Sequence, residues 1–241
     1  MKLQNKTILS QEAHGRWYED ACAAAFAMEL IGERWSLLIV RELMLGPRRF
    51  SDIRAELPGL SAKVLTERLA RMEEIGVLVR RKLPPPAATQ VFELTEWGYG
   101  LEEVMQVLGR WSVRSPLHDS TLPLTPTSFL LSLRTMMDPA RAEGLEVRVL
   151  FRTATELLFA HLAECELHVS RNPDPAPDAD LKLEADTVSQ FLGVFYGKRP
   201  ADECGVTLTG DPALAARFTD LFSLPPKCPL VRLQGDQAGA E

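Results

Sequence analysis

The sequence is poor in cysteine and has no long apolar run. Its four cysteines stand far apart, at positions 22, 165, 204 and 228, and none forms a Cys-x-x-Cys pair. This spacing excludes a disulfide framework and a zinc site, so we expect reduced thiols. No segment reaches the roughly 18 apolar residues of a membrane-spanning helix, and the first residues have no apolar signal-peptide core. We therefore predict a cytoplasmic protein without a membrane partner.

Catalytic signatures are also missing from the sequence. It contains no Ser-His-Asp constellation, no P-loop, no Gly-x-Gly-x-x-Gly fingerprint and no marked pair of carboxylates. His161 and His168 have no carboxylate or cysteine at ligand spacing, so we interpret them as surface histidines or as histidines whose hydrogen bonds are satisfied. The sequence therefore predicts a protein that is not an enzyme and needs neither a metal nor another cofactor.

Positive charge is scarce overall but concentrated in one stretch. The chain has 27 basic and 33 acidic residues, for a net charge of −6. Residues 1–114 are nearly balanced, with 16 basic and 15 acidic residues, whereas residues 115–241 have 11 and 18. Within residues 47–82, nine basic residues face five acidic ones. A local excess of this kind is what contact with nucleic-acid phosphates requires.

That basic stretch has the pattern of two short helices joined by a tight turn. Phe50, Ile53 and Leu57 recur at helical spacing, and a Pro-Gly pair at 58–59 ends the first helix. Ser61 is a good N-cap for a second helix over 61–75, which a glycine at position 76 closes. The pattern predicts a helix-turn-helix.

The second helix has two contrasting faces. Its apolar face contains Leu65, Leu69 and Met72. The opposite face carries small, polar and basic side chains, namely Lys63, Thr66, Glu67 and Ala70. A helix that enters the major groove needs such an outward face, because these groups reach base edges.

Two strand-like runs follow, VLVRRKL and TQVFELT, with a proline-rich tip between them. We interpret residues 77–95 as a hairpin, the wing of a winged helix. Helices over 21–31 and 33–45 precede the motif, and a helix over 96–114 follows it. The last helix has an apolar face of Leu101, Val104, Leu108 and Trp111 that is large for the end of a small domain, so we expect it to pack on a partner subunit.

The predicted DNA contacts divide by role. Base-edge contacts are expected from the second helix, and phosphate contacts from the start of the first helix and from the wing. The full predicted set is Arg48, Arg49, Ser61, Lys63, Thr66, Glu67, Arg71, Arg80, Arg81 and Lys82.

Residues 115–126 are rich in Ser, Thr and Pro and form the candidate linker. Beyond it, residues 127–241 show a helix, four strands in close succession, two further helices and a strand before a last helix. Four successive strands predict an antiparallel sheet. The chain is therefore expected to be an α+β protein of two domains, 1–114 and 127–241.

The first domain resembles the HxlR family of bacterial winged-helix transcription regulators. The resemblance covers residues 20–114 and rests on Cys22, IGERWSLLIVREL (31–43), GPRRFSDIRAELPGLSAKVLTERLARMEEIGVLVRR (46–81) and VFELTEWG (91–98). It implies a homodimer built from the first and last helices of the domain, bound to a two-fold DNA operator. It also implies that Cys22 is a candidate redox or electrophile sensor, although a small core residue is the alternative interpretation.

The second half is similar to the sterol-carrier-protein-like lipid-transfer fold. The similarity covers residues 125–222 and rests on Phe195-Tyr196-Gly197-Lys198, the VTLTGD run (206–211) and ARFTDLF (216–222). It implies a five-stranded antiparallel sheet covered by helices, with an apolar cavity between them. The candidate cavity residues are Phe129, Leu133, Met136, Phe191, Phe195, Phe218 and Phe222; a solid core is the alternative.

These observations predict a dimeric, sequence-specific DNA-binding transcription regulator. A small apolar ligand in the second domain would modulate it by changing the relation of the two recognition helices. Two other hypotheses stay open. One is a thiol-based regulator that acts through Cys22, and the other is a lipid carrier whose winged helix makes protein contacts.

Overall fold

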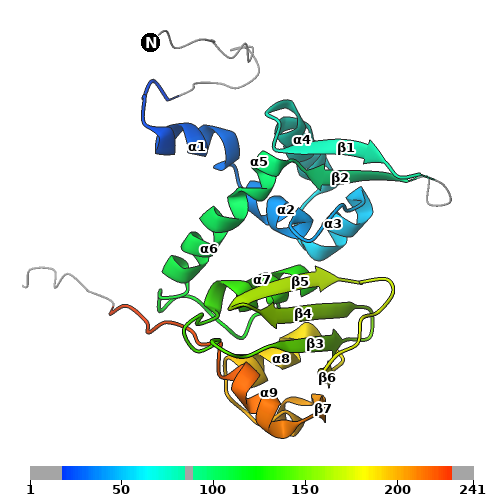
Figure 1. Cartoon of the computed structure of the whole chain (residues 1–241). Coiled ribbons are helices and arrows are strands. Elements are labelled where there is room, and N and C mark those ends of the chain that lie inside the picture. The colour runs from blue at the N-terminus through cyan, green and yellow to red at the C-terminus, as the bar shows by residue number, and fades with distance from the viewer. Residues whose placement is uncertain (1–17, 85–88, 230–241) are drawn as a thin grey trace, which may run out of the picture.

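The computed structural model describes residues 18–84 and 89–229. Figure 1 shows two units, one above the other, with the last helix of the first unit running down toward the second. The first unit contains α1 (Ala23–Ile31), α2 (Ser36–Leu43), α3 (Phe50–Glu56), α4 (Ala62–Glu74), β1 (Leu78–Lys82), β2 (Gln90–Leu94), α5 (Glu96–Tyr99) and α6 (Leu101–Ser112). The helix-turn-helix and the hairpin therefore form where the sequence predicts them.

Helix α4 owes its bounds to local signals. The Ser61 hydroxyl accepts a hydrogen bond from the backbone N–H of Val64 at 3.2 Å, which caps the N-terminus. Gly76 follows the helix with a φ of +77°, a conformation that glycine adopts without strain. Leu65, Leu69 and Met72 are buried against α2, α3 and the hairpin, as the apolar spacing predicts.

The helix predicted over 96–114 is interrupted. It forms α5 and α6, which meet at Gly100. Thr95 caps α5 through the backbone N–H of Gly98, at 3.1 Å. A Cβ atom at Gly98 would lie 2.1 Å from the carbonyl oxygen of Val77, so only glycine permits α5 to approach the hairpin this closely.

The second unit contains a five-stranded sheet and helices packed on it. Its elements are α7 (Pro126–Met136), β3 (Val147–Arg152), β4 (Leu157–Ala163), β5 (Glu166–Arg171), β6 (Leu181–Glu184), α8 (Val188–Phe195), the 3₁₀ turn Asp202–Cys204, β7 (Thr207–Gly210) and α9 (Pro212–Thr219). The strand order is β5-β4-β3-β6-β7. The α+β class is confirmed.

The expectation of a wholly antiparallel sheet is wrong at one pair of strands. β3 pairs with β6 in parallel, with Val149 opposite Leu181 and Phe151 opposite Leu183. The cause is the connection over residues 172–180, which leaves edge strand β5 and returns to the other side of β3. Because β5 and β3 both run antiparallel to β4, a strand that continues in the direction of β5 enters parallel to β3.

A packed aromatic core fills the space between the sheet and its helices. Phe129, Phe151 and Phe191 contact one another with ring centroids 5.2–5.4 Å apart, and Phe195 joins them to the pair Phe218 and Phe222. All six rings are fully buried. The expected cavity is therefore corrected to a solid core for Phe129, Leu133, Phe191, Phe195, Phe218 and Phe222.

Helix α7 belongs to both units. Phe129 and Leu133 enter the core of the second unit, whereas Leu131 is buried in the core of the first. The Thr125 hydroxyl, which caps α7, donates a hydrogen bond to the buried carboxylate of Glu42 at 2.9 Å. The predicted linker thus leads directly into a helix that fixes the two units together. No helix in the described ranges is long and apolar enough to cross a lipid bilayer.

Candidate nucleic-acid interface

The outward face of α4 is open to solvent. Lys63 leaves 86% of its side chain exposed and lies 4.0 Å from the carboxylate of Glu67, one helical turn further on. Thr66 is exposed, and its hydroxyl donates a hydrogen bond to the carbonyl of Ala62 at 2.9 Å. Since exposed ion pairs of this kind are weak, Lys63 and Glu67 can separate at little cost to meet other partners.

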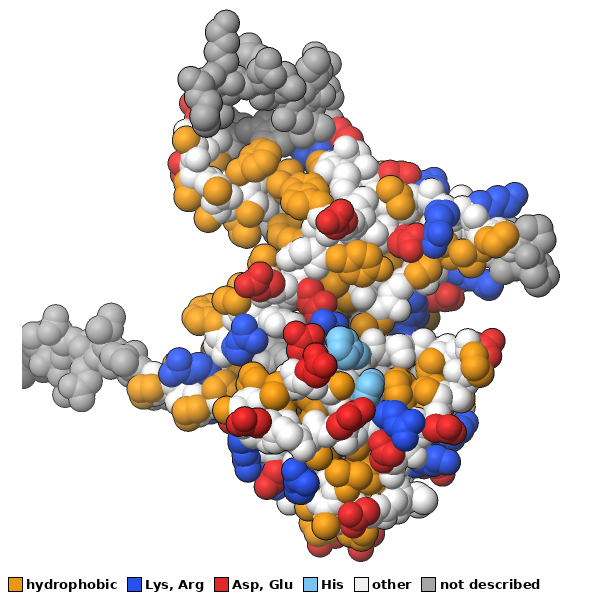
Figure 2. Space-filling model, in the orientation of Figure 1, with side chains coloured by type: hydrophobic (Ala, Val, Ile, Leu, Met, Phe, Trp, Pro, Cys, Tyr) orange, Lys and Arg blue, Asp and Glu red, His pale blue; other side chains and the backbone are white. Residues whose placement is uncertain are grey.

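The wing carries its three basic residues in different settings. Arg80 pairs with Glu73 of α4 at 3.1 Å, and Arg81 pairs with Glu93 of β2 at 2.8 Å. Lys82 is exposed, and within residues 18–84 and 89–229 no carboxylate lies at ion-pair distance from it. Figure 2 shows basic side chains gathered over the β1–β2 hairpin.

The two arginines before α3 point in different directions. Arg49 is exposed at the N-cap of α3, and no carboxylate of the described chain pairs with it. The backbone N–H of Arg48 donates a hydrogen bond to the carbonyl of Phe92 at 2.9 Å, and the N–H of Phe92 donates one to the carbonyl of Arg48 at 2.8 Å. The largely buried side chain of Arg48 approaches Glu56 to 3.5 Å. The expectation that Arg48 is free for phosphates is therefore wrong, because it lines a hollow together with Glu156 and Arg171 of the second unit.

Arg71 is also placed differently from the prediction. Its side chain is only 8% exposed, and its guanidinium pairs with Glu74 at 3.0 Å, so it does not extend the outward face of α4. Arg68, one turn earlier, pairs with Glu33 at 2.6 Å and ties α4 to the turn between α1 and α2. Each of these guanidinium groups is held by a carboxylate instead of projecting freely from α4.

An exposed apolar surface runs along α6. Val104, Val107, Leu108 and Trp111 all stand out into solvent, with 54% of Val107 and 74% of Trp111 exposed. Phe26 and Met28 of α1 are exposed as well, and Figure 2 shows hydrophobic side chains gathered over that helix. Several large apolar side chains exposed along one face of α6 are typical of a protein interface.

Cys22 lies at the N-cap of α1 and is exposed. The backbone N–H groups of Ala25 and Ala24 lower the pKa of its thiol, because they stabilise the thiolate. Cys165, Cys204 and Cys228 are partly buried.

Some important residues at the junction of the units were not predicted. Arg171 of β5 binds Glu56 of α3 and Glu156, and the Lys227 ammonium donates to the carbonyls of three residues that end α6 and begin the linker. No local pattern in the sequence signals these contacts. The bond from Arg171 to Glu56 and the bonds of Lys227 join residues more than a hundred positions apart, and the bond from Arg171 to Glu156 joins β5 to the loop before β4.

Comparisons with known proteins find sequence similarity to helix-turn-helix regulators. The family described as HxlR-like helix-turn-helix matches residues 30–118. The HTH-type transcriptional regulator YodB of Bacillus subtilis is 38% identical over 86 residues, which are 36% of this chain and 77% of YodB. The solved reduced form of YodB is 34% identical, covers 42% of this chain and 100% of that chain, and has a TM-score of 0.38.

One relative matches a longer part of the chain. The uncharacterized HTH-type transcriptional regulator Rv3095 of Mycobacterium tuberculosis is 30% identical over 162 residues, which are 65% of this chain and 87% of Rv3095. A match of that length extends beyond residues 30–118 and reaches into the second unit. The similarity between these two proteins is therefore not confined to the helix-turn-helix.

Proposed function

The chain belongs to the HxlR-like helix-turn-helix family, and from that premise we propose that it acts as a homodimeric, sequence-specific DNA-binding transcription regulator. The observation that carries the proposal is the exposure of Lys63, Thr66 and Glu67 on one face of α4, beside a basic hairpin. A helix with this face fits the major groove, and a basic hairpin beside it fits the phosphate backbone.

Each exposed group has a fitting partner in DNA. The Lys63 ammonium can donate to guanine O6 and N7, the Thr66 methyl group can contact a thymine methyl group, and the Glu67 carboxylate can accept from cytosine N4. Arg49 and Lys82, which have no ion-pair partner in the described ranges, are suited to phosphates. Arg80 and Arg81 can reach phosphates after exchanging their present carboxylate partners, whereas Ser61 acts mainly as the cap of α4.

The exposed faces of α1 and α6 support the dimer. A second copy of this chain would cover Phe26, Met28 and the apolar residues of α6, and would place two copies of α4 for a two-fold site. Half-sites read in successive major grooves lie one helical turn apart, about 34–36 Å.

Selection from a pool of random duplex DNA tests this function. We expect the full chain to enrich a two-fold symmetric sequence and to bind it with an affinity that falls steeply as salt concentration rises. Arg217→Ala, which removes an exposed charge from α9, is a matched control and should enrich the same sequence. Failure to bind any duplex at low ionic strength would overturn the proposal.

For the second unit we propose a ligand-responsive domain of sterol-carrier-like fold over residues 127–241. The packed phenylalanine core gives no support to a lipid-filled cavity beneath the sheet, so the lipid-carrier hypothesis loses its main argument. A thiol-based regulator remains a second candidate, and the lowered pKa of the exposed Cys22 thiol favours it.

A further inference from the structure

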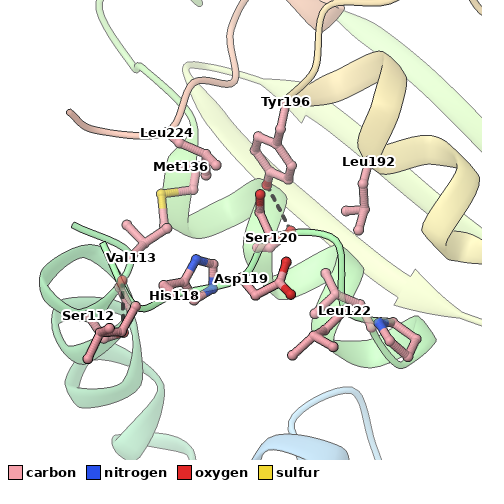
Figure 3. Close-up of a pocket in the computed structure, with 15 residues that line it drawn as sticks. Ser112, Val113, His118, Asp119, Ser120, Leu122, Met136, Leu192, Tyr196 and Leu224 are labelled. Carbon is pink, nitrogen blue, oxygen red and sulfur yellow. Dashed lines mark hydrogen bonds between the residues drawn. The ribbon is translucent and has the colours of Figure 1, made fainter. Parts of the chain in front are cut away.

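A cavity of about 460 Å³ lies at the junction of the two units. Its walls come from the end of α6, the linker, α7, α8 and Leu224, and they are mainly apolar. Figure 3 shows Met136, Leu192 and Tyr196 on one side of this space, with Val113 and the linker residues His118 and Asp119 facing them. Sites for small organic molecules have this volume and this apolar character.

The cavity has one well-defined polar point on its wall. The hydroxyl oxygens of Ser132 and Tyr196 lie 2.8 Å apart. The Ser132 hydroxyl also lies 2.7 Å from the carbonyl oxygen of Phe129, to which it donates its proton. A hydroxyl group has a single proton, so in the contact with Ser132 the Tyr196 hydroxyl is the donor. The Tyr196 oxygen is then left as an acceptor without a proton to offer, and it suits a ligand that brings a donor.

The charges around the cavity favour a neutral ligand. Burial raises the pKa of the Tyr196 hydroxyl, so this group stays neutral at ordinary pH. At the rim, hydrogen bonds from Thr121 lower the pKa of Asp119, so its carboxylate is charged and disfavours an anion. The deeper walls of Val113, Met136 and Leu192 offer no counter-charge to a buried cation.

We propose that this junction cavity is a binding site for a small, neutral, mainly apolar compound with one hydroxyl group, which donates its hydrogen bond to the Tyr196 oxygen. The cavity lies between α6, whose outer face carries the proposed dimer contact, and the second unit. Occupation of it would set the angle of α6, and hence the spacing of the two copies of α4. That regulatory consequence rests on the proposed function, whereas binding to the cavity does not.

The test measures binding to the full chain in the absence of DNA, so its outcome is separate from that of the DNA experiment. The probe is 2-naphthol, followed by its own fluorescence, and the comparison compound is 2-methoxynaphthalene, which has the same ring but no hydroxyl proton. We expect saturable binding of 2-naphthol and at least ten-fold weaker binding of the methyl ether. Equal affinities, or no saturable binding of 2-naphthol, would overturn the proposal.

Two variants locate the probe. The double variant Ser132→Ala/Tyr196→Phe removes both hydroxyl groups together, which leaves no unpaired polar atom and keeps the shape of the wall. It should bind the two compounds with equal affinity. Met136→Trp fills the cavity and should weaken 2-naphthol binding at least ten-fold. Thr209→Ala, which removes an exposed hydroxyl from β7, should bind like the natural chain. Unchanged binding in both cavity variants would place the probe elsewhere and refute the site.

Discussion

The Nη2 atom of Arg171 lies 2.6 Å from the Oε1 atom of Glu56, although 115 residues separate the two in the chain. Arg171 ends β5 of the second unit, and Glu56 ends α3 of the helix-turn-helix. The same guanidinium also binds Glu156 and donates to the Thr127 hydroxyl at 3.2 Å. With only 8% of its side chain exposed, Arg171 links the DNA-binding unit rigidly to the sheet.

Removal of this guanidinium should cost much stability. Arg171→Met leaves the largely buried carboxylates of Glu56 and Glu156 without their shared cation, and breaking such a buried pair costs about 3–5 kcal/mol. Urea unfolding at pH 7 measures the loss. Arg152→Met is the matched control, since its pair with Glu184 is exposed and its loss should cost less than about 1 kcal/mol. Equal effects of the two substitutions would show that Arg171 is no special link.

The loss in Arg171→Met should depend on pH. Burial raises the pKa of both Glu56 and Glu156 already in the natural chain. The folded state therefore holds these protons more tightly than the unfolded state, so their contribution favours folding at low pH and disappears as pH rises through the folded-state pKa. Without Arg171 the pKa values rise further, and unfolding measured at pH 5 should show a smaller loss than at pH 7. A loss that is the same or larger at pH 5 would contradict this cause.

Basic residues of the proposed DNA surface should affect DNA binding in two different ways. Lys63→Ala should relax the preference at one base position, because a base-edge contact is lost, at a cost of about 1–3 kcal/mol. Lys82→Ala should instead weaken all sequences about equally and lower the slope of affinity against salt by about 1. Binding titrations with the selected sequence and with a scrambled duplex, at several salt concentrations, distinguish these effects. A uniform loss in Lys63→Ala would remove that residue from base recognition.

The sequence predicts most of the helix-turn-helix because its signals are local. Ser61 caps α4, apolar residues recur within it at helical spacing, and Gly76 follows its end, so every signal lies within residues 61–76. The parallel pairing of β3 with β6 and the bond between Arg171 and Glu56 depend on how distant segments meet. Helical periodicity alone also places Arg71 near the open face, and only the packing around α4 shows that it is buried.

The same distinction applies to the junction cavity. Tyr196 stands in a motif that the sequence associates with the second domain, but its neighbour Phe195 is in the solid core while Tyr196 turns toward the linker. Of the predicted cavity residues, Met136 alone lines this space. Residue type alone does not distinguish the positions in the solid core from those that line the cavity, because both places are lined by apolar side chains.

The apolar face of α6 should control the oligomeric state. Val107→Glu places a charge in the middle of this face, where a second copy would have to desolvate it. Light scattering on the full chain should then give half the mass of the natural protein, together with weaker binding of a two-fold DNA site. Leu208→Glu, at an exposed position of edge strand β7, serves as control and should keep the natural mass. An unchanged mass in Val107→Glu would exclude this face from the dimer.

The thiol of Cys22 should react faster than the partly buried thiol of Cys204. Backbone N–H groups at the start of α1 lower its pKa, so a larger fraction is thiolate at neutral pH, and the thiolate is the form that reacts. Mass spectrometry after brief alkylation at neutral pH should show Cys22 modified first, because its thiol is exposed whereas that of Cys204 is partly buried. If this thiol regulates DNA binding, Cys22→Ser will abolish the response to an oxidant, and Cys204→Ser will keep it. A full response in Cys22→Ser would remove the thiol-based alternative and leave the regulation to the junction of the two units.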